Sequence, residues 1–281
     1  MTLRGALFSD EHRKRLEHDG FVRVEEVIPP ELVTAVLGAL RDVSAVDYAD
    51  SATWHLLPAS YPGIIPSHHH QSQWDIRQHP RLYEVFRELW RTPDLWVSMD
   101  RIGFVAPLRP GDTAACEIHW DVDPRGKSVY QAIVYLTDAG PERAPFCAVP
   151  DVFRNLDAWL ARRPESFDFS CADFSNEASV AVAGKAGDLI IWDSRLPHGP
   201  GPNYASSPRV MQAVTLFPAS EADWTAEEQI SWWRAKRAPP WWRDVPGQQD
   251  PEPGEPAVLS EHGRRLVGLR RWDTQFCGVS R

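Results

Sequence analysis

The sequence predicts a mainly β fold, a sandwich or a barrel, with helical segments before and after it. Between residues 94 and 218, short apolar runs are separated by Pro and Gly, which is the pattern of many short strands joined by turns. Helical spacing of apolar residues occurs mainly outside this region, apart from one helical insert at 151–163. The predicted strands are 94–99, 101–107, 114–121, 128–137, 144–149, 178–183, 188–193 and 208–217.

The segments before residue 94 are predicted to form three helices and one short strand. A helix is expected at 9–19, because a capping serine precedes it and a glycine follows it. Residues 21–28 are rich in Phe and Val and predict a strand. Two prolines precede a second helix, and a third is expected at about 80–90. Their inward positions are Leu32, Val33, Val36, Leu37 and Leu40, then Leu82, Val85, Phe86 and Leu89.

Residues 47–79 contain aromatic residues, Pro, Gly and five histidines without a clear periodicity. We predict a long irregular loop, of the kind that often forms a lid or a binding loop. His68, His69 and His70 form either a second metal site or a polar loop of exposed or hydrogen-bonded histidines, and we favour the polar loop. For His55, packing and a lid role are both open.

After residue 218 the pattern becomes helical again. A capping box at 225–228 begins a helix, and two prolines end it. Residues 244–258 have the composition of an exposed loop, and a last amphipathic segment covers 260–269. The chain has 13 Trp, and we interpret five of them as a layer that packs on the core, with a substrate wall or a subunit interface as the alternative. The five are Trp224, Trp232, Trp233, Trp241 and Trp242.

Composition and charge exclude several classes of function. The 281 residues are enough to bury a substantial core. A net charge of −9 and the lack of a basic run argue against nucleic-acid binding. No apolar run predicts a membrane span, and the N-terminus does not resemble a signal peptide. We interpret the scattered cysteines as reduced, mostly buried thiols, and we expect a cytoplasmic protein. The cysteines are Cys116, Cys147, Cys171 and Cys277.

Three residues in the β region form a candidate metal site. His119 and Asp121 lie two positions apart in a predicted strand, so their side chains point to the same face and Trp120 points away. His198 lies 77 residues after Asp121, where a strand runs into a Pro/Gly turn. A jelly roll is able to bring such a turn beside the first pair. Two histidines and one carboxylate are the ligands of a facial triad, which holds Fe(II) and leaves positions open.

Arg209 supplies a candidate co-substrate contact. It follows His198 by 11 residues and begins the next predicted strand. A 2-oxo acid fills two open positions on such an iron, and dioxygen fills the third. An arginine suits the far carboxylate of that acid because its charge is permanent and its guanidinium is planar.

The residues beside these four have simpler expected roles. Trp120 is expected to pack behind the site, and Trp192 to lie in the core. Arg195 is expected to pair with an acidic neighbour. Asp123 and Arg125 are expected to orient a ligand or to close the entrance.

Most of residues 9–218 resemble the phytanoyl-CoA dioxygenase family of Fe(II)- and 2-oxoglutarate-dependent oxygenases. The resemblance implies a double-stranded β-helix core (jelly roll, cupin-like) flanked by helices. It implies that His119, Asp121 and His198 hold Fe(II), that Arg209 binds 2-oxoglutarate, and that dioxygen is the oxidant. The motifs that carry it are Asp19-Gly20-Phe21-Val22, His119-Trp120-Asp121, residues 187–193, Pro197-His198-Gly199, Asn203 and Pro208-Arg209.

One position departs from the family pattern. Members often have a hydroxyl residue two positions after the second histidine, where it contacts 2-oxoglutarate, and this chain has Pro200 there. Gln131, on the strand after the His-x-Asp pair, is our candidate for a replacement contact. The chain also lacks a basic groove for a coenzyme A thioester, so the family name does not fix the substrate.

The expected reaction is oxidation of a C–H bond in a small-molecule substrate, by hydroxylation, desaturation or oxidative cyclisation. Related halogenases have a small residue where this chain has Asp121, so oxygen chemistry is predicted. A tailoring step in secondary-metabolite or antibiotic biosynthesis fits such a chain. The alternatives are a non-enzymatic metal-binding jelly-roll sensor and a zinc-type metallohydrolase or isomerase.

We expect one domain over residues 1–281. Its parts are N-terminal helices and the lid loop at 1–93, a jelly-roll core at 94–218, and a Trp-rich C-terminal helical extension at 219–281. We expect neither a nucleic acid nor a membrane as partner, and the sequence leaves the oligomeric state open.

Overall fold

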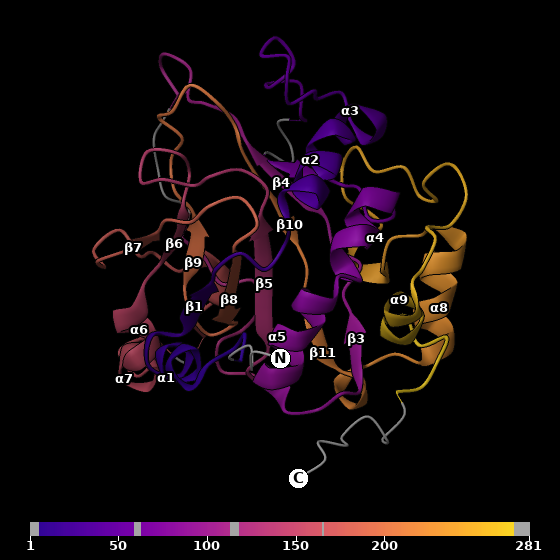
Figure 1. The fold of residues 1–281 in the computed structure, drawn as a ribbon. Coiled ribbons are helices and arrows are strands. Elements are labelled where there is room, and N and C mark those ends of the chain that lie inside the picture. The colour runs from indigo at the N-terminus through magenta and orange to yellow at the C-terminus, as the bar shows by residue number, and fades with distance from the viewer. Residues whose placement is uncertain (1–5, 59–62, 113–117, 165, 273–281) are drawn as a thin grey trace.

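The computed structural model describes residues 6–58, 63–112, 118–164 and 166–272 (Figure 1). Its largest element is a six-stranded sheet in which every neighbouring pair of strands is antiparallel. In spatial order the strands are β1 (Phe21–Val24), β8 (Leu189–Asp193), β5 (Tyr130–Tyr135), β10 (Arg209–Ala213), β4 (Ile102–Val105) and β2 (Ile64–Ile65).

A second, three-stranded sheet lies beside the first. Its order is β7 (Val180–Val182), β6 (Phe146–Ala148) and β9 (His198–Pro200), and an isolated antiparallel bridge joins His119 to His198 at its edge. A separate pair is formed by β3 (Leu95–Val97) and β11 (Leu216–Pro218). The second sheet occupies the left of Figure 1, where β6, β7 and β9 lie together.

Side chains alternate across the large sheet and fill two cores. Ile133 and Tyr135 of β5 pack with Phe146 of β6 in the core between the two sheets. Ala132 and Val134 of the same strand face the opposite side and pack with the helices. This period of two is the physical basis of the β pattern in the sequence, and it confirms the mainly β, jelly-roll fold with flanking helices.

The N-terminal helices cover the outer face of the large sheet with apolar side chains. Ser9 accepts from the backbone N–H of His12 and so caps the first helix, and Gly20 ends it with a positive φ of 79°. The helices of this part are α1 (Asp10–Asp19), α2 (Pro30–Gly38), α3 (Leu40–Val43), α4 (Gln71–Arg77) and α5 (Pro80–Trp90).

The later helices lie on two sides of the molecule (Figure 1). The insert between β6 and β7 forms two short helices, α6 and α7, close to α1, and the C-terminal helices α8 and α9 lie on the opposite side. Their bounds are α6 (Pro150–Arg154), α7 (Leu156–Leu160), α8 (Ala226–Ala235) and α9 (Glu261–Leu266), with 3-10 turns η1 (Phe169–Cys171), η2 (Ala219–Glu221) and η3 (Pro240–Trp242).

The prediction of an irregular loop over 47–79 was wrong for two short parts of it. Ile64 and Ile65 form β2, and 71–77 form helix α4. The apolar periodicity of α4 is hidden because the helix buries polar Gln73 and Arg77 as well as Trp74 and Ile76. The strand expected at 208–217 is divided into β10 and β11. The predicted strand at 114–121 lies partly outside the described residues, and within 118–121 the prediction was wrong, because only His119 forms an isolated β-bridge there.

The five C-terminal Trp residues include a cluster that packs internally. Trp224 and Trp232 have ring centroids 5.5 Å apart, and Trp241 lies 5.0 Å from Trp224. Trp232 is buried and Trp233 is partly buried against the helical core. Within the described ranges, no helix combines the length and the apolar character that crossing a membrane requires.

Candidate metal centre

The structure brings His119, Asp121 and His198 together from distant parts of the chain. One donor atom from each lies within 4.8 Å of the others, and among the described residues this is the one group of His, Cys, Asp and Glu that meets that condition. Asp121 lies between the two rings. His119 Nε2 is 3.4 Å from Asp121 Oδ1, and His198 Nε2 is 3.4 Å from Asp121 Oδ2.

Backbone pairing explains how His119 and His198, 79 positions apart in the sequence, come together. The N–H of His119 donates to the carbonyl of His198 at 2.9 Å, and the N–H of His198 donates to the carbonyl of His119 at 3.0 Å. The two residues are therefore a directly opposed antiparallel pair, whose side chains lie close together. Their ring centroids are 5.1 Å apart.

The ring of His198 is oriented for ligation through Nε2. Its Nδ1 donates to the backbone carbonyl of Leu196 at 3.0 Å, since a carbonyl only accepts. The ring packs between Trp192 and Phe146, with centroids at 4.8 and 5.6 Å. Such a bond fixes the tautomer and leaves the Nε2 lone pair for a metal.

The environment of Asp121 keeps its carboxylate ionised. Burial alone raises the pKa of Asp121, but the imidazoles of His119 and His198 beside it outweigh that effect and hold the pKa far below its usual range. An ionised carboxylate between two imidazoles is the donor set that a divalent iron accepts. The residues therefore fit the metal that the sequence predicts.

One side of the centre is open to solvent. The side chains of His119 and Asp121 are 48% and 37% exposed, whereas that of His198 is 7% exposed. A ligand set with one accessible side leaves room for further ligands, as a catalytic site requires.

Gln131, the predicted co-substrate contact, lies next to Asp121. Its Nε2 donates to Asp121 Oδ2 at 2.8 Å, and its Oε1 accepts from Trp192 Nε1 at 3.0 Å. The contact between Trp192 and Gln131 is not visible in the sequence, because it depends on the register that places these two residues opposite each other on β8 and β5.

Arg209 begins β10 on the face that also carries Met211 and Ala213. It is 3% exposed, and its Nε donates to the carbonyl of Ala144 at 2.8 Å. No carboxylate of the described residues lies within ion-pair distance of it. Burial lowers the pKa of Arg209, and Tyr135 and Cys147 partly oppose that shift. A buried cation without an anionic partner is costly to the folded state.

The structure places Trp120, Trp192 and Arg195 as predicted, whereas the roles predicted for Asp123 and Arg125 stay predictions. Trp120 is buried behind the site, where its Nε1 donates to the carbonyl of Arg195. Arg195 pairs with Asp193 at 2.9 Å, and Trp192 is buried. Asp123 and Arg125 pair with each other at 2.6 Å on the surface. Cys147 is buried and Cys171 is exposed, whereas Cys116 and Cys277 lie outside the described residues.

The three consecutive histidines do not join the metal centre. His68 Nδ1 donates to the carbonyl of Met99, and His69 Nε2 donates to that of Arg237. His70 caps helix α4 through its side chain. The favoured prediction of hydrogen-bonded histidines is confirmed, although His68 and His69 are buried and not exposed.

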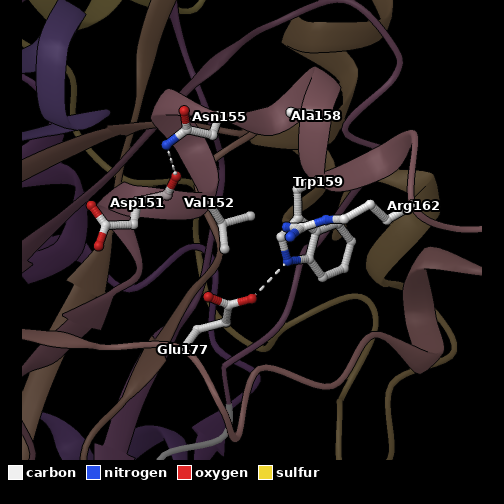
Figure 2. A pocket seen from close by; sticks show the side chains of 7 residues that line it. All are labelled: Asp151, Val152, Asn155, Ala158, Trp159, Arg162 and Glu177. Carbon is white, nitrogen blue, oxygen red and sulfur yellow. Dashed lines mark hydrogen bonds between the residues drawn. The ribbon is translucent and has the colours of Figure 1, made fainter.

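A pocket of about 390 Å³ lies outside this centre, against α6 and α7. Figure 2 shows its lining, in which Trp159 donates to Glu177. No predicted site residue lines it. Trp159 nevertheless packs edge-on against Trp120, with centroids 5.3 Å apart, so the pocket wall touches the residue behind the metal centre.

Known proteins share both the sequence pattern and the fold. A putative phytanoyl-CoA dioxygenase of Dictyostelium discoideum is 22% identical over 258 residues, which cover 73% of this chain and 74% of that protein. The crystal structure of SnoK, an alpha-ketoglutarate-dependent carbocyclase from nogalamycin biosynthesis, matches with a TM-score of 0.51 and 20% identity, over 75% of this chain and 84% of that one.

A second solved structure has the same fold over more of the chain. It is the epimerase SnoN in complex with Fe3+, alpha ketoglutarate and nogalamycin RO, with a TM-score of 0.53 and 18% identity over 90% of this chain and 96% of that one. Residues 16–211, well over half of the chain, match the phytanoyl-CoA dioxygenase (PhyH) family. The chain therefore belongs to the phytanoyl-CoA dioxygenase family.

Proposed function

We propose that this protein is an Fe(II)- and 2-oxoglutarate-dependent dioxygenase that oxidises a C–H bond of a small metabolite. In this proposal His119, Asp121 and His198 hold the iron, and Arg209 binds the far carboxylate of 2-oxoglutarate. When bound, the iron and its co-substrate would supply an oxidant that removes hydrogen from carbon. In the net reaction, 2-oxoglutarate and one oxygen atom of dioxygen would become succinate and carbon dioxide, and the other oxygen atom would end in the product or in water.

The proposal is carried by two features that occur together in this protein: a three-donor cluster, and a buried arginine that has no carboxylate partner among the described residues. A zinc hydrolase has no use for such a cation. A metal-binding sensor has no need for an open face beside the donors, and the exposed sides of His119 and Asp121 provide one. Both alternatives therefore explain less of the site.

Gln131 keeps its proposed contact with 2-oxoglutarate. An amide nitrogen carries two hydrogens, and Asp121 takes one of them. The second hydrogen is a donor for the co-substrate in the absence of a hydroxyl at position 200.

The substrate class is proposed from the relatives. SnoK is a carbocyclase and SnoN is an epimerase, both from nogalamycin biosynthesis, so one fold supports different outcomes at carbon. We propose a tailoring step in the biosynthesis of an antibiotic or another secondary metabolite. Hydroxylation, desaturation and cyclisation remain distinct outcomes of the same hydrogen removal.

The test is an anaerobic titration of metal-free protein with Fe(II) and 2-oxoglutarate, followed by visible absorption. We expect a weak charge-transfer band from the chelated 2-oxo acid, and we expect it to weaken in Asp121→Ala and Arg209→Ala. Bound iron without a band would overturn the co-substrate assignment and favour the sensor or the hydrolase. Turnover products from candidate metabolites would then identify the reaction.

A further inference from the structure

The side chains of Trp192 and Gln131 form a hydrogen-bonded chain that ends on the metal-site carboxylate. Trp192 Nε1 donates to Gln131 Oε1 at 3.0 Å, and Gln131 Nε2 donates to Asp121 Oδ2 at 2.8 Å. Trp192 and Gln131 are opposite residues on the antiparallel strands β8 and β5, so both side chains leave the sheet on the same face.

The chemistry of the two ends fixes the direction of the amide between them. An indole N–H only donates, and an ionised carboxylate only accepts. The amide oxygen of Gln131 must therefore face Trp192, and the amide nitrogen must face Asp121. The reversed amide would oppose two donors at one end and two acceptors at the other.

Trp192, at the first position of this hydrogen-bonded series, is held in place by packing. Trp192 is 6% exposed and packs against Phe146 with ring centroids 4.9 Å apart. The same indole contacts the ring of His198 at 4.8 Å. One packed side chain thus positions two of the three donor residues, His198 by ring contact and Asp121 through Gln131.

We propose that Gln131, oriented by Trp192, is a positioning residue that makes Asp121 bind the metal through a single carboxylate oxygen. This inference rests on the proposed function. Oδ1 lies 3.4 Å from His119 Nε2 and Oδ2 lies 3.4 Å from His198 Nε2, so distance alone does not select one oxygen. The hydrogen bond from Gln131 at Oδ2 competes with chelation by both oxygens and favours binding through Oδ1. One-oxygen binding keeps three positions of an octahedral iron open, which two co-substrate atoms and dioxygen require.

The experiment measures Co(II) binding to metal-free protein by calorimetry and by visible absorption, whose intensity reports the coordination number. The variants are Gln131→Met, which keeps size, Trp192→Phe, which removes the indole N–H, and the double variant. Trp159→Phe is the matched control. Trp159 is also a buried indole donor, but it donates to Glu177, which takes no part in the hydrogen-bonded series from Trp192 to Asp121.

Loss of a residue that hydrogen-bonds to a metal ligand typically lowers metal affinity by roughly 10–100-fold. We expect each single variant to lower Co(II) affinity by about 10-fold, the smaller value of that range. We expect the double variant to match the single ones, because both substitutions break one chain. The Co(II) spectrum should change in all three and stay unchanged in Trp159→Phe. Melting by circular dichroism shows which variants are folded, and Gln131→Met keeps the test valid if Trp192→Phe does not fold.

Wild-type affinity and spectrum in Gln131→Met would overturn the inference, and so would effects that multiply in the double variant. The Co(II) readout does not involve 2-oxoglutarate. A protein that binds Co(II) with these dependences, but shows no charge-transfer band with Fe(II) and 2-oxoglutarate, would retain the positioning role and lose the proposed function.

Discussion

Two regions of the molecule bring histidines together, and they do so with opposite chemistry. At the metal centre, His119 and His198 direct their Nε2 atoms toward Asp121, and one side of the centre is open. In the second region, His68 and His69 are buried, and each donates to a backbone carbonyl from another part of the chain. Both regions lie close to acidic residues, but in different ways.

The position of the carboxylate distinguishes a candidate metal site from a structural pair. Asp121 lies between the histidine nitrogens, whereas Glu252 accepts from the backbone N–H groups of His68 and His69 and not from their rings. Burial lowers the pKa of both buried histidines, which keeps the rings neutral. Consecutive histidines in the sequence are therefore a weaker sign of a metal site than nitrogen and carboxylate donors that converge in space.

The largest expected effect is the loss of metal from one region only. Asp121→Ala should weaken Fe(II) binding by more than about 100-fold, since a lost ligand should cost more than the roughly 10–100-fold of a lost outer partner. Anaerobic calorimetry measures it. Asp123→Ala, which removes a carboxylate two residues away, should bind Fe(II) like the wild type, as should His69→Gln. Loss of binding in His69→Gln would remove the distinction between the regions.

The next effect concerns Arg209, the buried cation that begins β10. Arg209→Leu should weaken 2-oxoglutarate binding by roughly 30-fold or more, because removing one partner of a buried charge pair costs about 2–5 kcal/mol. In the absence of ligands the melting temperature should stay equal or rise, since an unpaired buried charge is lost. Arg195→Leu, which breaks a half-exposed ion pair, should leave 2-oxoglutarate binding unchanged. A clear fall in melting temperature for Arg209→Leu would mean a structural role.

A smaller effect is expected from the buried pair, and it should appear in stability alone. His69→Ala removes the bond to the carbonyl of Arg237 and the stacking on Trp74, whose centroid is 6.2 Å away. It should lower the free energy of unfolding by about 1–3 kcal/mol, the cost of leaving a buried polar group unpaired. Urea denaturation measures the change, and Fe(II) affinity of the folded variant is the control. A stability within error of wild type would show that His69 is not structural.

The smallest effect is a pH dependence of stability. Burial places the pKa of folded His69 well below its ordinary value of 6.5, so the unfolded chain binds more protons just below that pH. Stability should fall as the pH drops from about 7 to about 5.5, by up to about 1.4 kcal/mol from this residue. Burial raises the pKa of Glu252, and that shift makes stability rise as the pH drops, opposite to the effect of His69. The contribution of His69 is therefore measured as a difference in stability between variants.

Chemical denaturation across this pH range should show a weaker slope in His69→Gln than in the wild type. Equal slopes in wild type and His69→Gln would assign the titration to other groups.

The helices that the sequence located well have a clear local signal, either an apolar periodicity or a capping box. The predicted helix at 80–90 is α5, and the capping box at Thr225 and Glu228 begins α8. Helix α4 was missed because His70 caps it and its buried face includes Gln73 and Arg77, which apolar periodicity cannot register. Local sequence signals do not predict a helix whose buried polar side chains are stabilised by tertiary contacts.

At the candidate site, the identity of the donors follows from the sequence, because the residue types and their close spacing at His119 and Asp121 are local properties. The position of His198 beside them depends on the folded structure, in which it forms reciprocal backbone hydrogen bonds with His119. It also decided that Gln131 contacts Asp121 and Trp192, and that His68 and His69 face backbone carbonyls. These contacts depend on strand register and on packing between distant segments, and no single segment of the chain encodes either.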